Sequence, residues 1–205
     1  MSENEKNLTE QEWVDVARSI IVNDSDFEYA GAHYFKAEEK NPQNAEATFF
    51  AAYMSYKSLL GEGDTASATR AFRAMAENAA AAVEAIKEYQ GVAEMQGVVA
   101  GAVAIVFTPV TRYVFTKLHQ TAQVNIEKGV LALYALGDAL QECFGDSATI
   151  VNLAVEAWKE GIALQRQYYA YKYEGVNPEE YAAKIQKVEP TYTMPKKSGC
   201  ISFSI

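Results

Sequence analysis

The side chains that most often carry catalysis or bind metals are few in this sequence and lie far apart. His33 and His119 are its only histidines, and neither belongs to an HExxH motif or to a cluster with the ligand spacing of a zinc site. Cys143 and Cys200 form no CxxC pair. A nucleophile elbow and a glycine-rich phosphate loop are also missing from the sequence. We therefore expect a protein without catalytic activity, metal or cofactor.

One acidic stretch offers oxygen ligands at alternating positions, as a calcium loop does. It reads Asn-Asp-Ser-Asp-Phe-Glu at residues 23–28, and it lacks the loop glycine and the distal glutamate of such a loop. Ser25, followed three residues later by Glu28, also matches a capping box, in which two side chains close the start of a helix. We predict a helix cap here, with Ser25 opening the helix.

Aromatic residues on one predicted helix indicate a different chemistry, the non-covalent recognition of a partner. Phe49, Tyr53 and Tyr56 are spaced i, i+4 and i+7, so they share one helical face. They stand opposite a face of small residues that a neighbouring backbone can approach closely. Such aromatic side chains either contact a ligand or pack against the next pair of helices. The sequence leaves both interpretations open.

The helix that carries these aromatics is paired with the helix before it. Ala30, Tyr34 and Ala37 fall on one face of that preceding helix. Asn41 and Pro42 end that helix, because proline has no N–H to donate and disfavours a helical conformation in the residue before it. Asn44 can then cap the next helix. The two helices are predicted to form an antiparallel hairpin.

Across residues 11–60, this order of small, aromatic and small residues followed by proline resembles the tetratricopeptide repeat. Ala30, Tyr34, Ala37 and Pro42 carry the resemblance. It implies helical pairs that stack side by side, with the later helices continuing the stack in degenerate form. It also implies a scaffold that grips a peptide or a partner domain in a concave groove and that performs no catalysis.

In this family the first helix of each pair lines the groove. The resemblance therefore implies the following partner-binding residues in this chain: Glu46, Phe49, Tyr53, Tyr56 and Lys57. Some family members use a lysine and asparagine clamp for the C-terminal carboxylate of a partner, but here Phe49 and Tyr53 occupy those positions. Recognition of a terminal carboxylate by that clamp is therefore not expected.

The rest of the sequence also has helical periodicity. Thr9 and Glu12 match a capping box before a first helix at 10–22. A sheet would require sustained alternation of period two between turn residues, which the sequence lacks. Further helix starts are predicted at Asp64 or Thr65, at Asp146 or Ser147, and at Asn177–Pro178. We predict one all-α domain over residues 1–188, with antiparallel hairpins stacked like tetratricopeptide repeats at its N-terminal end and a bundle of longer helices after them.

Residues 95–111 contain no charged side chain. Gly97 and Gly101 form a GxxxG spacing, which lets helices approach closely in lipid. The run is shorter than the roughly 20 residues of a membrane span, and Pro109 must kink or end its helix. The same small residues allow close packing in a soluble core, which we expect here. A membrane-associated protein that uses this segment, or a small-ligand-binding helical bundle, are the alternative functions.

Charge is distributed unevenly along the chain. The formal net charge is −9, and residues 1–50 hold eleven acidic and four basic side chains. Lysine and arginine are not clustered as nucleic-acid binding requires. The N-terminal residues are polar and acidic, whereas a secretory signal needs basic residues followed by apolar ones. We expect a cytoplasmic protein that binds a protein or peptide and no nucleic acid. Membrane binding is not expected, and self-association stays open.

The C-terminal segment differs from the helical domain. Residues 189–205 contain two prolines and no helical periodicity, so an extended or disordered tail is predicted. Its last ten residues, 196–205, combine a basic pair with an apolar end. They have three interpretations: disorder, return to the chain's own groove, or addition as a strand to the sheet edge of a partner. The tyrosines at 168–173 could equally belong to a groove, the core or a dimer contact.

Overall fold

Eight α-helices follow one another along the residues that the structure describes. The computed structural model describes residues 8–118, 123–171 and 173–197. These residues form no strand, so the predicted all-α fold class is confirmed. The helices are α1 (Glu10–Asp24), α2 (Phe27–Lys40), α3 (Ala45–Gly61), α4 (Thr65–Lys87), α5 (Ala93–Lys117), α6 (Gln123–Phe144), α7 (Ala148–Gln167) and α8 (Pro178–Val188).

Short polar side chains start several of these helices, as the sequence predicts. Thr9 and Glu12 form a complete capping box before α1. The side chain of Asn44 accepts a hydrogen bond from the backbone N–H of Ala47 at 2.9 Å and caps α3. Asn177 caps α8 in the same way. Each cap provides a partner for an N–H that the first helical turn leaves unpaired.

The capping box predicted at Ser25 is wrong. Ser25 ends α1 with a left-handed backbone, at a φ of 54°, and its N–H donates to the carbonyl of Ile21 at 3.2 Å. Asp26 caps α2 instead, because its carboxylate accepts a hydrogen bond from the N–H of Tyr29 at 2.9 Å. One tight turn both ends α1 and starts α2, so the cap moves to the next residue along the chain.

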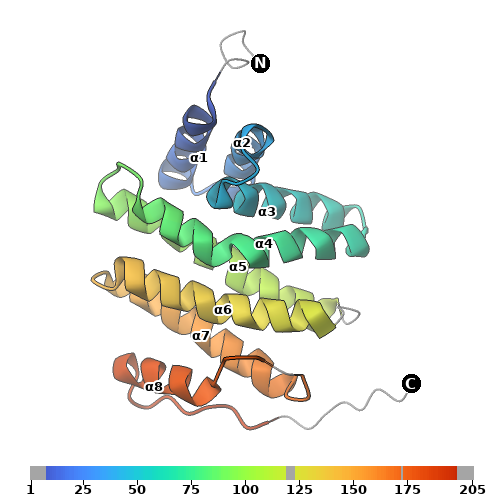
Figure 1. Cartoon of the computed structure of the whole chain (residues 1–205), viewed down its shortest axis with the longest axis vertical. Coiled ribbons are helices and arrows are strands. Elements are labelled where there is room, and N and C mark those ends of the chain that lie inside the picture. Colours follow the sequence, from blue (N-terminus) through green and yellow to red (C-terminus); the bar gives the residue numbers. More distant parts are fainter. Residues whose placement is uncertain (1–7, 119–122, 172, 198–205) are drawn as a thin grey trace.

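The helices are arranged in chain order, from α1 and α2 at one end of the molecule to α8 at the other (Figure 1). α3 packs against α2 and α4, and α4 also contacts α5 and α6. α6 and α7 form a second close pair, with α8 against α7. α5 contacts both α1 and α7. It therefore connects the N-terminal helices to the C-terminal ones.

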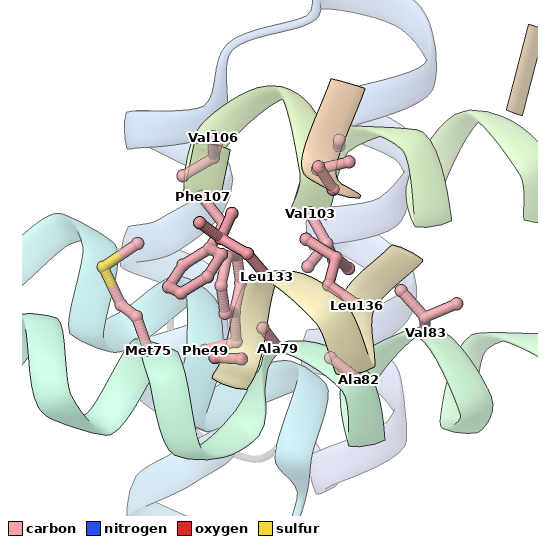
Figure 2. Close-up of a cluster of buried hydrophobic side chains, with 14 of the residues drawn as sticks. Phe49, Met75, Ala79, Ala82, Val83, Val103, Val106, Phe107, Leu133 and Leu136 are labelled. Carbon is pink, nitrogen blue, oxygen red and sulfur yellow. The ribbon is translucent and has the colours of Figure 1, made fainter. Parts of the chain in front are cut away.

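Side chains from four helices meet in the core beside α5. Figure 2 shows Phe49, Met75, Phe107 and Leu133, which come from α3, α4, α5 and α6 and are fully buried. The ring centroid of Phe107 lies 6.2 Å from that of Phe49 and 5.9 Å from that of Phe72. Aromatic pairs at such separations add attraction to the area that they bury. This cluster fixes one face of α5 against the N-terminal helices.

Two glycines let α6 and α7 approach each other closely. A Cβ atom added to Gly137 of α6 would lie 2.3 Å from Nε1 of Trp158 of α7. One added to Gly161 of α7 would lie 3.2 Å from the ring of Tyr134 of α6. Each large ring therefore lies over the glycine of the opposite helix, and both rings are buried.

Pro109, at which the sequence predicts a kink or an end of the helix, does not end it. Pro109 lies inside α5, which continues to Lys117. The ring removes the N–H that would donate to the carbonyl of Ile105 in the preceding turn. Pro109 itself is exposed, so this interruption faces the surface of the molecule and leaves the packed face of α5 intact.

Part of the predicted C-terminal tail contacts the domain. Residues 189–197 contain no helix, but the side chain of Gln186 donates to the carbonyl of Tyr192 at 3.0 Å. Met194 packs against the core. Residues 198–205, with the apolar end on which the three tail interpretations depend, lie outside the described residues.

The tyrosines after α7 join its end to α5. Tyr168 donates a hydrogen bond to the backbone carbonyl of Phe115 at 3.0 Å. Tyr173 donates to the carbonyl of Tyr168 at 3.1 Å. Both rings pack against the core, whereas Tyr169 is exposed. Tyr168 therefore joins the end of α7 to the end of α5, and Tyr173 holds the following segment against Tyr168.

Gly137→Ala is expected to destabilise the protein by about 1–3 kcal/mol, because the added methyl group would overlap the indole of Trp158 in a packed core. Urea unfolding followed by circular dichroism measures the loss. Gly61→Ala is the matched control, since a Cβ atom at Gly61 has no neighbour within 4 Å. Equal stability of the two variants would contradict the close approach of α6 and α7.

Candidate binding groove along α5

The structure separates the five predicted groove residues into two groups. Tyr53, Tyr56 and Lys57 line one cavity at the surface of α3. Glu46 is 1% exposed and Phe49 is fully buried, so these two side chains serve the interior of the domain. Tyr56 lines the cavity but is only 2% exposed and also belongs to the core. That the five residues bind a partner stays a prediction.

Glu46 forms a buried network that ties together the first three helices. Its carboxylate accepts two hydrogen bonds from the guanidinium of Arg18, at 3.0 and 2.7 Å, and a third from the hydroxyl of Tyr34. The three side chains come from α1, α2 and α3. A bidentate contact with arginine and a third donor compensate for removing the carboxylate from water.

The protonation states of this network follow from its burial. Burial and the Glu46 charge raise the pKa of Tyr34 well above its ordinary value, so the phenol keeps its proton and donates it. Burial alone would lower the pKa of Arg18, but its hydrogen bonds and charge interaction with Glu46 raise it. The guanidinium carbon also lies 4.2 Å from the ring centroid of Tyr89. A polar cavity of about 810 Å³ lies beside this network.

A second cavity, here called the tyrosine pocket, lies between α3 and α5 near the other end of α3. Its volume is about 500 Å³. It is largely apolar, with Lys57 among its lining residues. The other residues that line it include Phe27, Tyr53, Tyr56, Ile105, Pro109 and Tyr113.

Tyr56 contributes an unpaired polar atom to this pocket. The residue is 2% exposed, and its hydroxyl group has no hydrogen-bond partner among the residues that the structure describes. Burial, followed by the influence of Tyr113 and Tyr53, raises the pKa of Tyr56 to about 12. The hydroxyl is therefore neutral at physiological pH. An unpaired buried donor of this kind is costly and uncommon in folded proteins.

An apolar stripe on the outer face of α5 extends from the tyrosine pocket. Ile105 is 51% exposed, Val98 is 43% exposed and Tyr113 is 41% exposed, and Met95 and Pro109 are exposed on the same helix. From Met95 to Tyr113 the stripe rises over eighteen residue steps of helix, or about 27 Å at 1.5 Å per residue. Exposed apolar side chains gathered on one face mark interaction sites more often than isolated apolar residues do.

A third cavity, of about 840 Å³, continues the hollow on the α7 side of the stripe. Ile105 lines both this cavity and the tyrosine pocket, so the two hollows adjoin at that residue. Together they form what we call the α5 groove. Gly101 lies at its floor, where an added Cβ would be 3.3 Å from Leu153 of α7. The GxxxG spacing therefore serves contact between α5 and α7, as expected for a core.

The candidate reactive residues do not gather into a site. No group of three or more His, Cys, Asp or Glu side chains that could hold a metal occurs in the part of the chain that the structure describes. The Nδ1 atom of His33 lies 3.0 Å from the carbonyl of Tyr29 in the preceding turn. Cys143 is half-buried, and burial raises the pKa of its thiol. His119 and Cys200 lie outside the described residues.

The sequence carries a signal for the buried network. Val14, Ala17, Arg18 and Ile21 follow one apolar helical face, so an arginine at that position has to find a buried partner. The exposed stripe of α5 had no such signal. The helix is apolar around most of its circumference, which predicts burial on all sides.

Glu46→Ala is expected to cost about 3–5 kcal/mol of stability, because it leaves the guanidinium of Arg18 buried without its anion. Chemical denaturation measures the change. The matched control is Glu28→Ala, which removes an exposed ion pair with Lys57 and is expected to cost less than about 1 kcal/mol. Equal losses in the two variants would rule out a central structural role for Glu46.

The raised pKa values of Tyr34 and Tyr56 predict loss of stability at alkaline pH. The folded state holds both phenols neutral, whereas unfolded tyrosine ionises near its ordinary pKa of about 10. The ionisation of these two groups therefore leaves the free energy of unfolding unchanged below a pH of about 10 and lowers it as pH rises through the folded pKa values. Phenolate absorbance and helicity should change together in this range. Complete ionisation of every tyrosine with unchanged helicity would contradict the prediction.

Comparisons of this chain with family models, with curated proteins and with solved structures find no match. Its function has to be inferred from its own residues, and the feature that most needs an explanation is the α5 groove with its unpaired tyrosine hydroxyl.

Proposed function

We propose that this protein is a non-enzymatic interaction module that binds a peptide or a partner protein in the α5 groove. The observation that carries the proposal is the row of exposed apolar side chains on α5, which adjoins a tyrosine-lined pocket. Three of the residues implied by the tetratricopeptide resemblance, Tyr53, Tyr56 and Lys57, line that pocket. The proposal also includes a cytoplasmic location and a stacking of the N-terminal hairpins like that of tetratricopeptide repeats.

The groove has the physical properties of a docking surface. Its floor is a helix held from behind by the aromatic contacts of Phe107, so little order has to be gained when a partner binds. Aromatic rings and large aliphatic side chains at its surface are the residue types that anchor protein interfaces. The hydroxyl of Tyr56 adds a polar group that can fix the orientation of a ligand.

A membrane function is less well supported. By length and composition, α5 is the single helix of the described chain that could cross a membrane. However, 67% of its most apolar eighteen-residue window is buried, and the glycine at 101 faces α7 rather than lipid. These contacts support a helix that is mainly core and that presents one narrow stripe at the surface.

Ile105→Asp tests the proposed function. Ile105 is half-exposed at the junction of the two hollows, so a carboxylate there should leave the fold intact and repel an apolar partner. In affinity capture from the source cell, a specific partner should be retained by the unaltered chain and be at least about tenfold depleted with this variant, as expected for an interface anchor.

Val188→Asp is the matched control. Val188 is a 39% exposed apolar residue of α8, far from α5 in the fold (Figure 1). This variant carries the same charge change and should retain the partner. Partners captured equally by both variants, with both folded by circular dichroism, would contradict binding in the α5 groove.

A further inference from the structure

The unpaired hydroxyl of Tyr56 limits what can occupy the groove. Removing a hydroxyl group from water without giving it a hydrogen bond destabilises the folded chain. Phenylalanine would fill the same space at that position without this cost. The hydroxyl of Tyr56 therefore calls for an acceptor that the described part of the chain does not provide.

The ligand group that satisfies Tyr56 is an oxygen acceptor. With its pKa raised to about 12, the phenol carries its proton at physiological pH and can donate it. Its neighbours in the pocket are mainly apolar, including Phe27, Ile105 and Pro109. An occupant therefore has to combine an apolar body with an oxygen that can approach the buried hydroxyl of Tyr56.

The same lining favours a helix over an extended peptide. An extended segment would bring a row of unpaired N–H and C=O groups into a hollow that offers few polar partners. A helix satisfies these groups internally, except for the carbonyls of its last turn. Those carbonyls are the acceptors that Tyr56 lacks.

One cation lines the pocket, and it is already paired with a carboxylate. Lys57 lines the pocket, and its exposed ammonium group lies 3.2 Å from the carboxylate of Glu28. Glu28 raises the pKa of Lys57, so the group stays cationic. The C-terminal end of a helix carries partial negative charge, so a helix that ends here would share this cation with Glu28.

Access to the pocket depends on the tyrosines beside Tyr56. Tyr53 is half-buried, and Tyr113 is 41% exposed. Exposed side chains change rotamer on the picosecond to nanosecond scale. The hydroxyl of Tyr56 is itself buried, so a ligand reaches it only when the side chains around it move.

We propose that the tyrosine pocket receives the C-terminal turn of an amphipathic partner helix, whose apolar side chains fill the pocket and whose unpaired backbone carbonyl accepts the hydrogen bond of Tyr56. The rest of the partner helix lies along the exposed stripe of α5, with apolar residues at helical spacing against Val98 and Ile105. This inference rests on the proposed function, since it names the class of partner that the α5 groove binds.

The test uses a peptide selected against the full chain from a displayed library of random sequences about 18 residues long, which matches the length of the stripe at 1.5 Å per residue. The affinity of the selected peptide is measured for the unaltered chain and for Ile105→Asp, Val188→Asp and Tyr56→Phe. Tyr56→Phe is expected to weaken binding by about five- to tenfold, the effect of losing one hydrogen bond. It should also raise the melting temperature of the free protein, because it removes an unsatisfied buried group. Circular dichroism should show the peptide becoming helical on binding.

The direction of the peptide is tested separately. A photocrosslinking side chain in place of the exposed Lys57 should attach to the last turn of the bound peptide, and attachment to its first turn would overturn the proposed orientation. Peptides that depend on Ile105 but bind Tyr56→Phe with unchanged affinity would overturn this inference and leave the groove function standing. If no selected peptide is sensitive to Ile105→Asp, the groove function fails and the inference fails with it.

Discussion

The carboxylate of Glu46 is the point on which the N-terminal half of this fold depends. It lies at the first turn of α3 and accepts hydrogen bonds from Arg18 of α1 and Tyr34 of α2. Apolar packing alone permits helices to slide or rotate at modest cost, whereas a buried bidentate ion pair has one favourable geometry. The network therefore sets the register of α3 relative to α1 and α2. The register of α3 in turn decides which of its aromatic residues face α5.

The same helix consequently has two roles at its two ends. Phe49, one turn after Glu46, meets Phe107 in the core. Tyr53 and Tyr56 follow on that face, and they line a cavity of about 500 Å³ between α3 and α5. An aromatic stripe with regular helical spacing thus begins as core and ends as pocket lining. This change along one face explains why the choice between ligand contact and packing could not be made from spacing alone.

Local signals in the sequence predicted the helices better than the groove. Caps such as Asn44 act through neighbouring residues, so their meaning can be deduced without tertiary structure. Ser25 was misassigned because Asp26 offers an equivalent side-chain acceptor one residue later, and only the length of α1 decides between them. The exposure of Ile105 depends on where α3 and α7 stop covering α5. Such an edge is a property of helix packing and has no signature in an apolar segment.

The interlocked pairs Gly137–Trp158 and Gly161–Tyr134 also have a consequence for the order in which the chain acquires structure. Glycine in the interior of a helix makes that helix less stable than alanine would. Here each glycine contributes to packing only when the ring of the opposite helix lies over it. α6 and α7 therefore gain little from forming alone and much from forming as a pair. The alanine-rich α4 has a higher intrinsic helix propensity. The two parts of the domain therefore acquire helical structure for different reasons. α4 is favoured by its own helix propensity, whereas α6 and α7 are stabilised mainly by packing against each other.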